Sequence, residues 1–136
     1  MQNRVSFEAE RQKENLSEQL KGICLFNSFI ERVHLHKNLE ISISAVLLTS
    51  HPHFIEYLNP PKVCSKHGTL IFENVRRLVT TDFELDKVFD SDSADSYDYG
   101  FIQDVSIEDD HFVINGDFGT LQVWADNFSL PLGDYL

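Results

Sequence analysis

The first apolar positions along the chain follow a helical spacing. Residues 7–21 place a few apolar side chains at helical intervals, and this predicts an amphipathic helix. Ser6 is a candidate N-cap, and Gly22 is a stop signal directly after the helix. Because the apolar positions are sparse and Glu repeats at every fourth position in part of the segment, we expect the helix to need docking against the rest of the chain.

Further along the chain, apolar residues repeat at every second position, which is typical of β-strands. The pattern predicts one strand over residues 29–35, a tight turn at 37–38 and a second strand over 39–47. Together these segments form a predicted β-hairpin. The apolar residues expected to share one face of its first strand are Phe29, Val33 and Leu35.

The rest of the chain alternates short apolar segments with polar turns. Prolines disfavour a regular strand through residues 49–67. An acidic loop is expected at 90–98, and Asn115-Gly116 predicts a type I′ hairpin turn. The further strands are predicted over residues 68–75, 77–80, 101–107, 111–114, 118–125 and 128–132.

These elements predict a mainly β fold with one N-terminal helix. Six to eight strands with short connections indicate an antiparallel meander curled into a sandwich or a partly open barrel. The length of 136 residues suits a single domain, with a helical segment at 1–22 and a β-domain at 28–132. The residues expected in the core of the last strands are Phe112, Ile114, Leu121 and Trp124.

The charged residues are distributed unevenly. Residues 1–87 hold all 11 Lys and Arg together with 11 acidic residues, whereas residues 88–136 hold the other 11 acidic residues and no Lys or Arg. Such a segment is neutralised by solvent ions or by a basic partner. We expect no direct binding of nucleic acid, because phosphate contacts need Lys and Arg.

Neither a signal peptide nor a run of apolar residues long enough to cross a bilayer is present in the sequence. We therefore expect a cytoplasmic protein without membrane association. In that compartment Cys24 and Cys64 are expected to stay reduced.

Histidines and cysteines are the candidate metal ligands of the sequence. The pairs are His34 with His36, His51 with His53, and Cys64 with His67. None of them completes a conventional zinc spacing. The acidic loop lacks the glycine and glutamate that an EF-hand requires, and common motifs for nucleophilic catalysis are absent. We expect neither a cofactor nor enzymatic activity, and a histidine-based metal-dependent enzyme is the less favoured alternative.

Some short segments of the strand pattern resemble those of a known group of proteins. They include Phe-Ile-Glu-Arg-Val-His-Leu at residues 29–35, Gly-Thr-Leu-Ile-Phe-Glu-Asn-Val at 68–75 and Asp-Phe-Gly-Thr-Leu at 117–121. Over residues 28–130 the chain resembles small, mostly uncharacterised bacterial β-rich proteins. Some of these are grouped with immunity proteins of polymorphic toxin systems. The resemblance implies a protein partner and carries over no active-site residue.

Charge and resemblance together favour a non-enzymatic protein-binding module. In this hypothesis the acidic C-terminal half covers a basic surface of a partner such as a toxin, where carboxylates steer the encounter and aromatic side chains anchor it. A small-ligand-binding β-barrel is the first alternative. The candidate partner-binding residues are Asp90, Asp92, Asp95, Tyr97, Asp98 and Tyr99.

Overall fold

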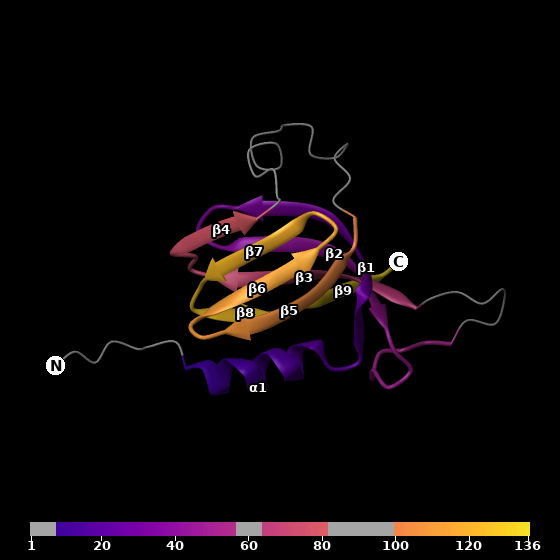
Figure 1. The fold of residues 1–136 in the computed structure, drawn as a ribbon. Coiled ribbons are helices and arrows are strands. Elements are labelled where there is room, and N and C mark those ends of the chain that lie inside the picture. The colour runs from indigo at the N-terminus through magenta and orange to yellow at the C-terminus, as the bar shows by residue number, and fades with distance from the viewer. Residues whose placement is uncertain (1–7, 57–63, 82–99) are drawn as a thin grey trace.

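Two antiparallel sheets and one helix make up the computed structural model, which describes residues 8–56, 64–81 and 100–136 (Figure 1). The first sheet has the order β1-β2-β3-β8, with β9 also paired to β3, and the second has the order β4-β7-β6-β5. The helix is α1 (Ala9–Leu20), and the strands are β1 (Ile23–Leu35), β2 (Leu39–Leu47), β3 (Ser65–Glu73), β4 (Arg77–Thr81), β5 (Ile102–Glu108), β6 (His111–Gly116), β7 (Gly119–Trp124), β8 (Asn127–Ser129) and β9 (Leu132–Tyr135).

This arrangement confirms the predicted mainly β, antiparallel fold with an N-terminal helix. Over the described residues the two sheets do not close into a barrel. They approach each other where β1 meets the start of β5, through a single bridge between Phe29 and Phe101 and a hydrogen bond from Ile30 N to Gly100 O of 2.9 Å. The fold is therefore an open sandwich, and α1 contacts both β5 and β8 along its side (Figure 1).

The helix is shorter than its pattern predicts. It begins at Ala9 and ends at Leu20, and Glu8 occupies the N-cap position. The proposed cap, Ser6, lies outside the described residues. Gly22 acts as the expected stop, because its φ of +77° is a conformation that a side chain disfavours.

The predicted hairpin is confirmed as β1 and β2, but one of its faces was wrongly predicted. All five apolar residues of β2 at alternate positions are buried. In β1, however, Ile30 is buried and Phe29 is 38% exposed. The register shifts between Ile30 and Arg32, so one extra residue reverses the alternation there. Phe29 therefore lies on the face opposite to Val33.

The turn between β6 and β7 also lies two residues later than predicted. Asn115 and Gly116 continue β6, and Gly116 pairs with Gly119. The side chain of Asn115 donates to Asp104 Oδ1 at 3.0 Å and accepts from Thr120 Oγ1 at 2.7 Å, which holds it within the sheet. The turn is formed by residues 117–118, and Gly119 supplies the positive φ of +118°.

Other strand boundaries differ from the prediction as well. β1 begins at Ile23, six residues before the predicted start at Phe29. β3 begins at Ser65 and ends at Glu73, because Asn74 adopts a φ of +55° and the chain crosses to the second sheet. The single strand predicted over 128–132 is divided into β8 and β9. Pro131 lies between them and has no N–H to donate to a ladder.

Aromatic side chains fill the space between the sheets. Phe72, Phe112 and Phe128 are buried, and their ring centroids lie 5.1–6.1 Å apart. The predicted core positions Phe112, Ile114 and Leu121 are confirmed as buried, with exposed fractions of 0%, 0% and 1%. Trp124 was wrongly placed in the core. It follows the buried Val123 in the alternation of β7 and lies on the outer face of the sheet.

Candidate protein-binding face

The outward side chains of the second sheet form three rows that cross its strands. We call this surface the outer face. The register aligns Asp104, Asn115, Thr120 and Thr81 in one row, and Ser106, Val113, Gln122 and Val79 in the next. The third row contains Glu108, His111, Trp124 and Arg77.

His111 and Trp124 form a stacked pair in the third row. Their ring centroids lie 4.1 Å apart, with an angle of 20° between the rings. His111 is only 7% exposed although it points outward, because the stacked indole and its neighbours cover it. On the other side of β7, the Arg77 guanidinium lies 4.7 Å from the Trp124 ring centroid and makes a cation–π contact.

Hydrogen bonds hold this pair in place. His111 Nε2 lies 2.9 Å from Gln122 Oε1, and His111 Nδ1 lies 3.1 Å from Asp110 Oδ1. The same oxygen of Asp110 accepts a hydrogen bond from Trp124 Nε1 at 3.1 Å. The indole is thus bound at its ring face and at its N–H, so that its orientation is set before any partner arrives.

Asp110 is kept ionised by these contacts. The hydrogen bond from His111 is the largest influence that lowers the pKa of Asp110 below its ordinary value of 3.8, and the bond from Trp124 adds to it. Near neutral pH the carboxylate therefore carries a full negative charge at the border of the outer face.

The turn between β5 and β6 places carboxylates beside this pair. Glu108, Asp109 and Asp110 are consecutive and exposed. Asp109 has a φ of +53°, a conformation that Asp and Asn tolerate better than most residues. We call these three residues the acidic turn.

Other acidic residues of the C-terminal half serve the fold. Asp117 Oδ2 accepts from Phe101 N at 2.9 Å, and Asp126 forms an ion pair with Arg76 at 2.7 Å. Asp104 accepts from Asn115. In the acidic turn, Asp110 binds the side chain of Trp124, while Glu108 and Asp109 are exposed.

The candidate partner-binding residues taken from the sequence cannot be compared with this face. Asp90, Asp92, Asp95, Tyr97, Asp98 and Tyr99 all fall outside the described residues, so their prediction stays untested. The stacked pair was missed by the sequence prediction because Trp124 was assigned to the core. The signal that could have found it is the alternation of β7, which sets Trp124 out of phase with Leu121 and Val123.

The histidine pairs are close together but do not gather further metal ligands. The ring centroids of His34 and His36 lie 4.5 Å apart, and those of His51 and His53 lie 5.5 Å apart. Within residues 8–56, 64–81 and 100–136, no three His, Cys, Asp or Glu residues are grouped so that they could hold a metal ion.

Cys64 and His67, the third candidate pair, lie in different surroundings. Cys64 is buried, and its Sγ accepts a hydrogen bond from Ile55 N at 3.4 Å. His67 instead lies on the surface, with its Nδ1 3.4 Å from a carboxylate oxygen of Glu31. Cys24 is half-buried, and both thiols are free.

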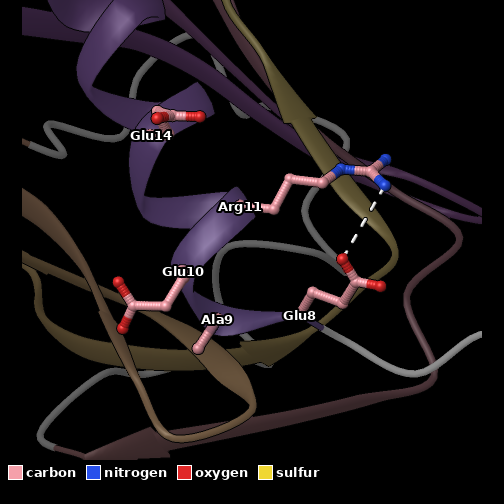
Figure 2. A pocket seen from close by; sticks show the side chains of 5 residues that line it. All are labelled: Glu8, Ala9, Glu10, Arg11 and Glu14. Carbon is pink, nitrogen blue, oxygen red and sulfur yellow. Dashed lines mark ion pairs between the residues drawn. The ribbon is translucent and has the colours of Figure 1, made fainter.

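Two surface pockets lie beside α1. Figure 2 shows the first, of about 520 Å³, which is lined by Glu8, Ala9, Glu10, Arg11 and Glu14, and Arg11 lies 3.9 Å from a carboxylate oxygen of Glu8. Its lining is largely charged, unlike the mainly apolar and aromatic lining typical of small-molecule sites.

The second pocket, of about 600 Å³, lies between the C-terminal end of α1 and the turn after β2. Its lining includes Glu18, Lys21, His51 and Leu130. Partial burial, followed by the nearby charges of His53 and Lys66, lowers the pKa of His51 below its ordinary value of 6.5. Neither pocket lies in the space between the two sheets, which is filled by the phenylalanines described above.

Comparisons with family models, curated proteins and solved structures gave no match to this chain. In the described part of the chain, no helix has the length and apolar character needed to cross a bilayer. The candidate site therefore depends on its own geometry: a fixed aromatic pair beside three exposed carboxylates.

Proposed function

We propose that this protein is a non-enzymatic, cytoplasmic binding module that docks its outer face and acidic turn onto a basic surface of another protein. The observation that carries the proposal is the position of Trp124, which is half-buried and is held by Asp110 of the acidic turn and by His111, the residue that pairs with Glu108. Aromatic anchors surrounded by charged groups are typical of protein interfaces.

The two parts of the face have different roles in this proposal. The exposed carboxylates attract a basic partner over a distance of about 8–10 Å in physiological salt, and they mainly raise the association rate. The indole contributes affinity after contact, because its rigid orientation reduces the entropy lost on binding. The absence of Lys and Arg after residue 87 favours a basic partner over an acidic one.

The resemblance to immunity proteins suggests which kind of basic surface is covered. A toxin that acts on nucleic acid has a positively charged substrate groove. A carboxylate-bordered face that occupied such a groove would inhibit the toxin without any chemistry of its own. We therefore propose an inhibitor of this kind as the most specific form of the function.

The test is affinity capture from the native cell with two matched variants. Glu108→Gln/Asp109→Asn removes two negative charges from the acidic turn, and Asn suits the positive φ at position 109. The control, Glu10→Gln/Glu14→Gln, removes the same charge from the exposed surface of α1 (Figure 2). Asp110 is left unchanged because it holds Trp124.

A basic protein captured by the wild type and the control, and reduced at least severalfold with the acidic-turn variant, supports the proposal. Trp124→Ala should then accelerate dissociation of the same partner, whereas the acidic-turn variant should slow its association. Equal capture by all three proteins would refute the assignment of this face. So would a partner whose association rate is independent of salt.

A further inference from the structure

The edge of β8 that does not pair with β3 is covered by side chains of α1. Gln12 Nε2 donates to Asp126 O at 3.2 Å, and Asn15 Nδ2 donates to Phe128 O at 2.9 Å. Gln19 Oε1 accepts from Leu130 N at 3.0 Å. Figure 1 shows α1 running along this side of the sandwich, next to β8 and β5. Three amide side chains of the helix thus satisfy three backbone groups at the edge of the first sheet.

These backbone groups are the ones that a further strand would use. In an extended strand, alternate residues direct their N–H and C=O groups to the same side. Phe128 is the middle residue of β8, and Asp126 and Leu130 flank this three-residue strand two positions away on either side. Asp126 N donates to Glu73 O at 2.8 Å, so Asp126 offers only its C=O to the side that α1 covers. Without the helix, the β8 edge would have unpaired donors and acceptors, which is the feature that promotes edge-to-edge association of sheets.

Few apolar side chains attach α1 to the rest of the protein. Leu16 is its one buried apolar residue within the described chain, while Ala9 and Leu20 are partly buried. The helix has 12 residues, and Glu8 makes no side-chain capping bond to any described residue. Such a short helix is marginal by itself. Gln12 Oε1 is buried and accepts no hydrogen bond from the described residues, which further weakens the docking.

We propose that α1 is a detachable cap, and that release of α1 lets the β8 edge pair with the β8 edge of a second copy of the chain. The edge is self-complementary. Asp126 O and Leu130 N lie two residues before and two residues after Phe128. An antiparallel pair centred on Phe128 therefore brings the donor at 130 of each copy to the acceptor at 126 of the other.

The cap accordingly prevents a dimer that the edge itself would allow. The net charge of −11 on each copy opposes this pairing, so that it is favoured at high protein and salt concentrations. This inference does not depend on the proposed function, since it involves the opposite sheet and no basic partner.

The test uses the full chain with Gln12→Ala/Asn15→Ala/Gln19→Ala. Alanine has a higher helix propensity than the residues replaced, so that this variant loses the bonds to β8 without an intrinsic penalty to the helix. The control is Lys13→Ala/Glu14→Ala/Ser17→Ala, which alters three exposed residues of the same helix and leaves the net charge unchanged. Amide hydrogen exchange at Leu130 and sedimentation equilibrium in 0.5 M salt are the measurements.

In the amide-deleted variant at low concentration, we expect exchange at Leu130 to be accelerated about two- to tenfold, as loss of one net hydrogen bond implies. At rising concentration, the variant should become dimeric and Leu130 should regain protection. The single substitution Gln19→Ala gives the exchange result even if the triple variant folds poorly. Wild type and control should remain monomeric with slow exchange.

Three results would overturn the inference. One is a triple variant that remains monomeric at millimolar concentration, and another is a dimer in which Leu130 still exchanges quickly, because such a dimer uses another surface. The third is unchanged exchange at Leu130 in Gln19→Ala, which would show that the helix does not protect the edge.

Discussion

Replacement of Phe112 by alanine tests the core on which both sheets depend. Its side chain is fully buried, and its ring lies 5.2 Å from that of Phe72 and 6.1 Å from that of Phe128. Truncation of a buried Phe costs ~3–5 kcal/mol, because the transfer free energy of the ring is lost and a cavity remains. Loss of two aromatic contacts places the expected value in the upper half of that range.

The chain offers a matched control for this substitution. Phe26 is 63% exposed, so that Phe26→Ala should change the free energy of unfolding by less than about 0.5 kcal/mol. For a domain of this size, the cost at Phe112 corresponds to a decrease in Tm of roughly 10–20 °C. Phe112→Leu, which keeps most of the volume, should be destabilised by less and serves if the alanine variant does not fold.

Urea unfolding followed by fluorescence measures all three variants. Trp124 is the single tryptophan of the chain, and its environment on β7 changes when the second sheet unfolds. The free energy of unfolding should decrease in the order Phe26→Ala, Phe112→Leu, Phe112→Ala. Equal values for the two alanine variants would refute the packing described here, since the exposed and buried rings would then contribute alike.

Three further predictions concern charge and pH. The pKa of Asp110 is lowered in the folded protein, so this carboxylate stabilises the fold fully above its ordinary pKa of 3.8, and the stabilisation is lost as pH falls through the folded pKa. In urea unfolding, Asp110→Asn should therefore be less stable than wild type at pH 7, and the difference in free energy of unfolding should shrink below about pH 4. The pKa of His51 is also lowered in the folded protein, so as pH falls through 6.5 the unfolded chain binds a proton at His51 before the folded chain does, and the wild type loses stability. His51→Asn should therefore lose less stability than wild type between pH 7.5 and pH 5, and equal losses in the two proteins would contradict this prediction. Replacement by Asn of Asp90, Asp92, Asp95 and Asp98, which the sequence predicts to share a loop, should slow association with a basic partner more than it accelerates dissociation. Association rates measured by stopped flow at two salt concentrations would contradict this prediction if they do not depend on salt.

The proposed face and the β8 edge under the proposed cap belong to different sheets, although α1 itself also contacts β5. The acidic turn and Trp124 belong to the second sheet, whereas α1 covers the β8 edge of the first. A partner could therefore occupy the outer face while the cap stays in place. Variants of one surface should leave the measurements made on the other unchanged, and this keeps the two proposals separable.

Local pattern alone determined much of the fold. The alternation of apolar and polar residues in 39–47 matches the alternation of buried and half-buried positions in β2. A period of two places all apolar side chains on one face of a strand, so this pattern predicts a strand with that face buried. Gly22 ends α1 as predicted, since a positive φ at that position is a property of the residue itself. The lack of cations after residue 87 likewise needs no structure to be known.

Tertiary structure decided the features that depend on neighbouring strands. An extra residue in β1 turned Phe29 outward, and no pattern within that strand reveals a register that β2 imposes. Asn115-Gly116 was predicted as a turn by its own propensity, yet the bonds of Asn115 to Asp104 and Thr120 keep it in β6. Cross-strand hydrogen bonds outweighed local preference at that position.

The candidate site shows the same division. Its acidic character was evident from composition, but the contact between His111 and Trp124 depends on the pairing of β6 with β7. The cap on β8 joins residues more than 100 positions apart, as Asn15 and Phe128 show. Such contacts arise only after the chain has closed long loops, and the positions that make them carry no local signal of their distant partner.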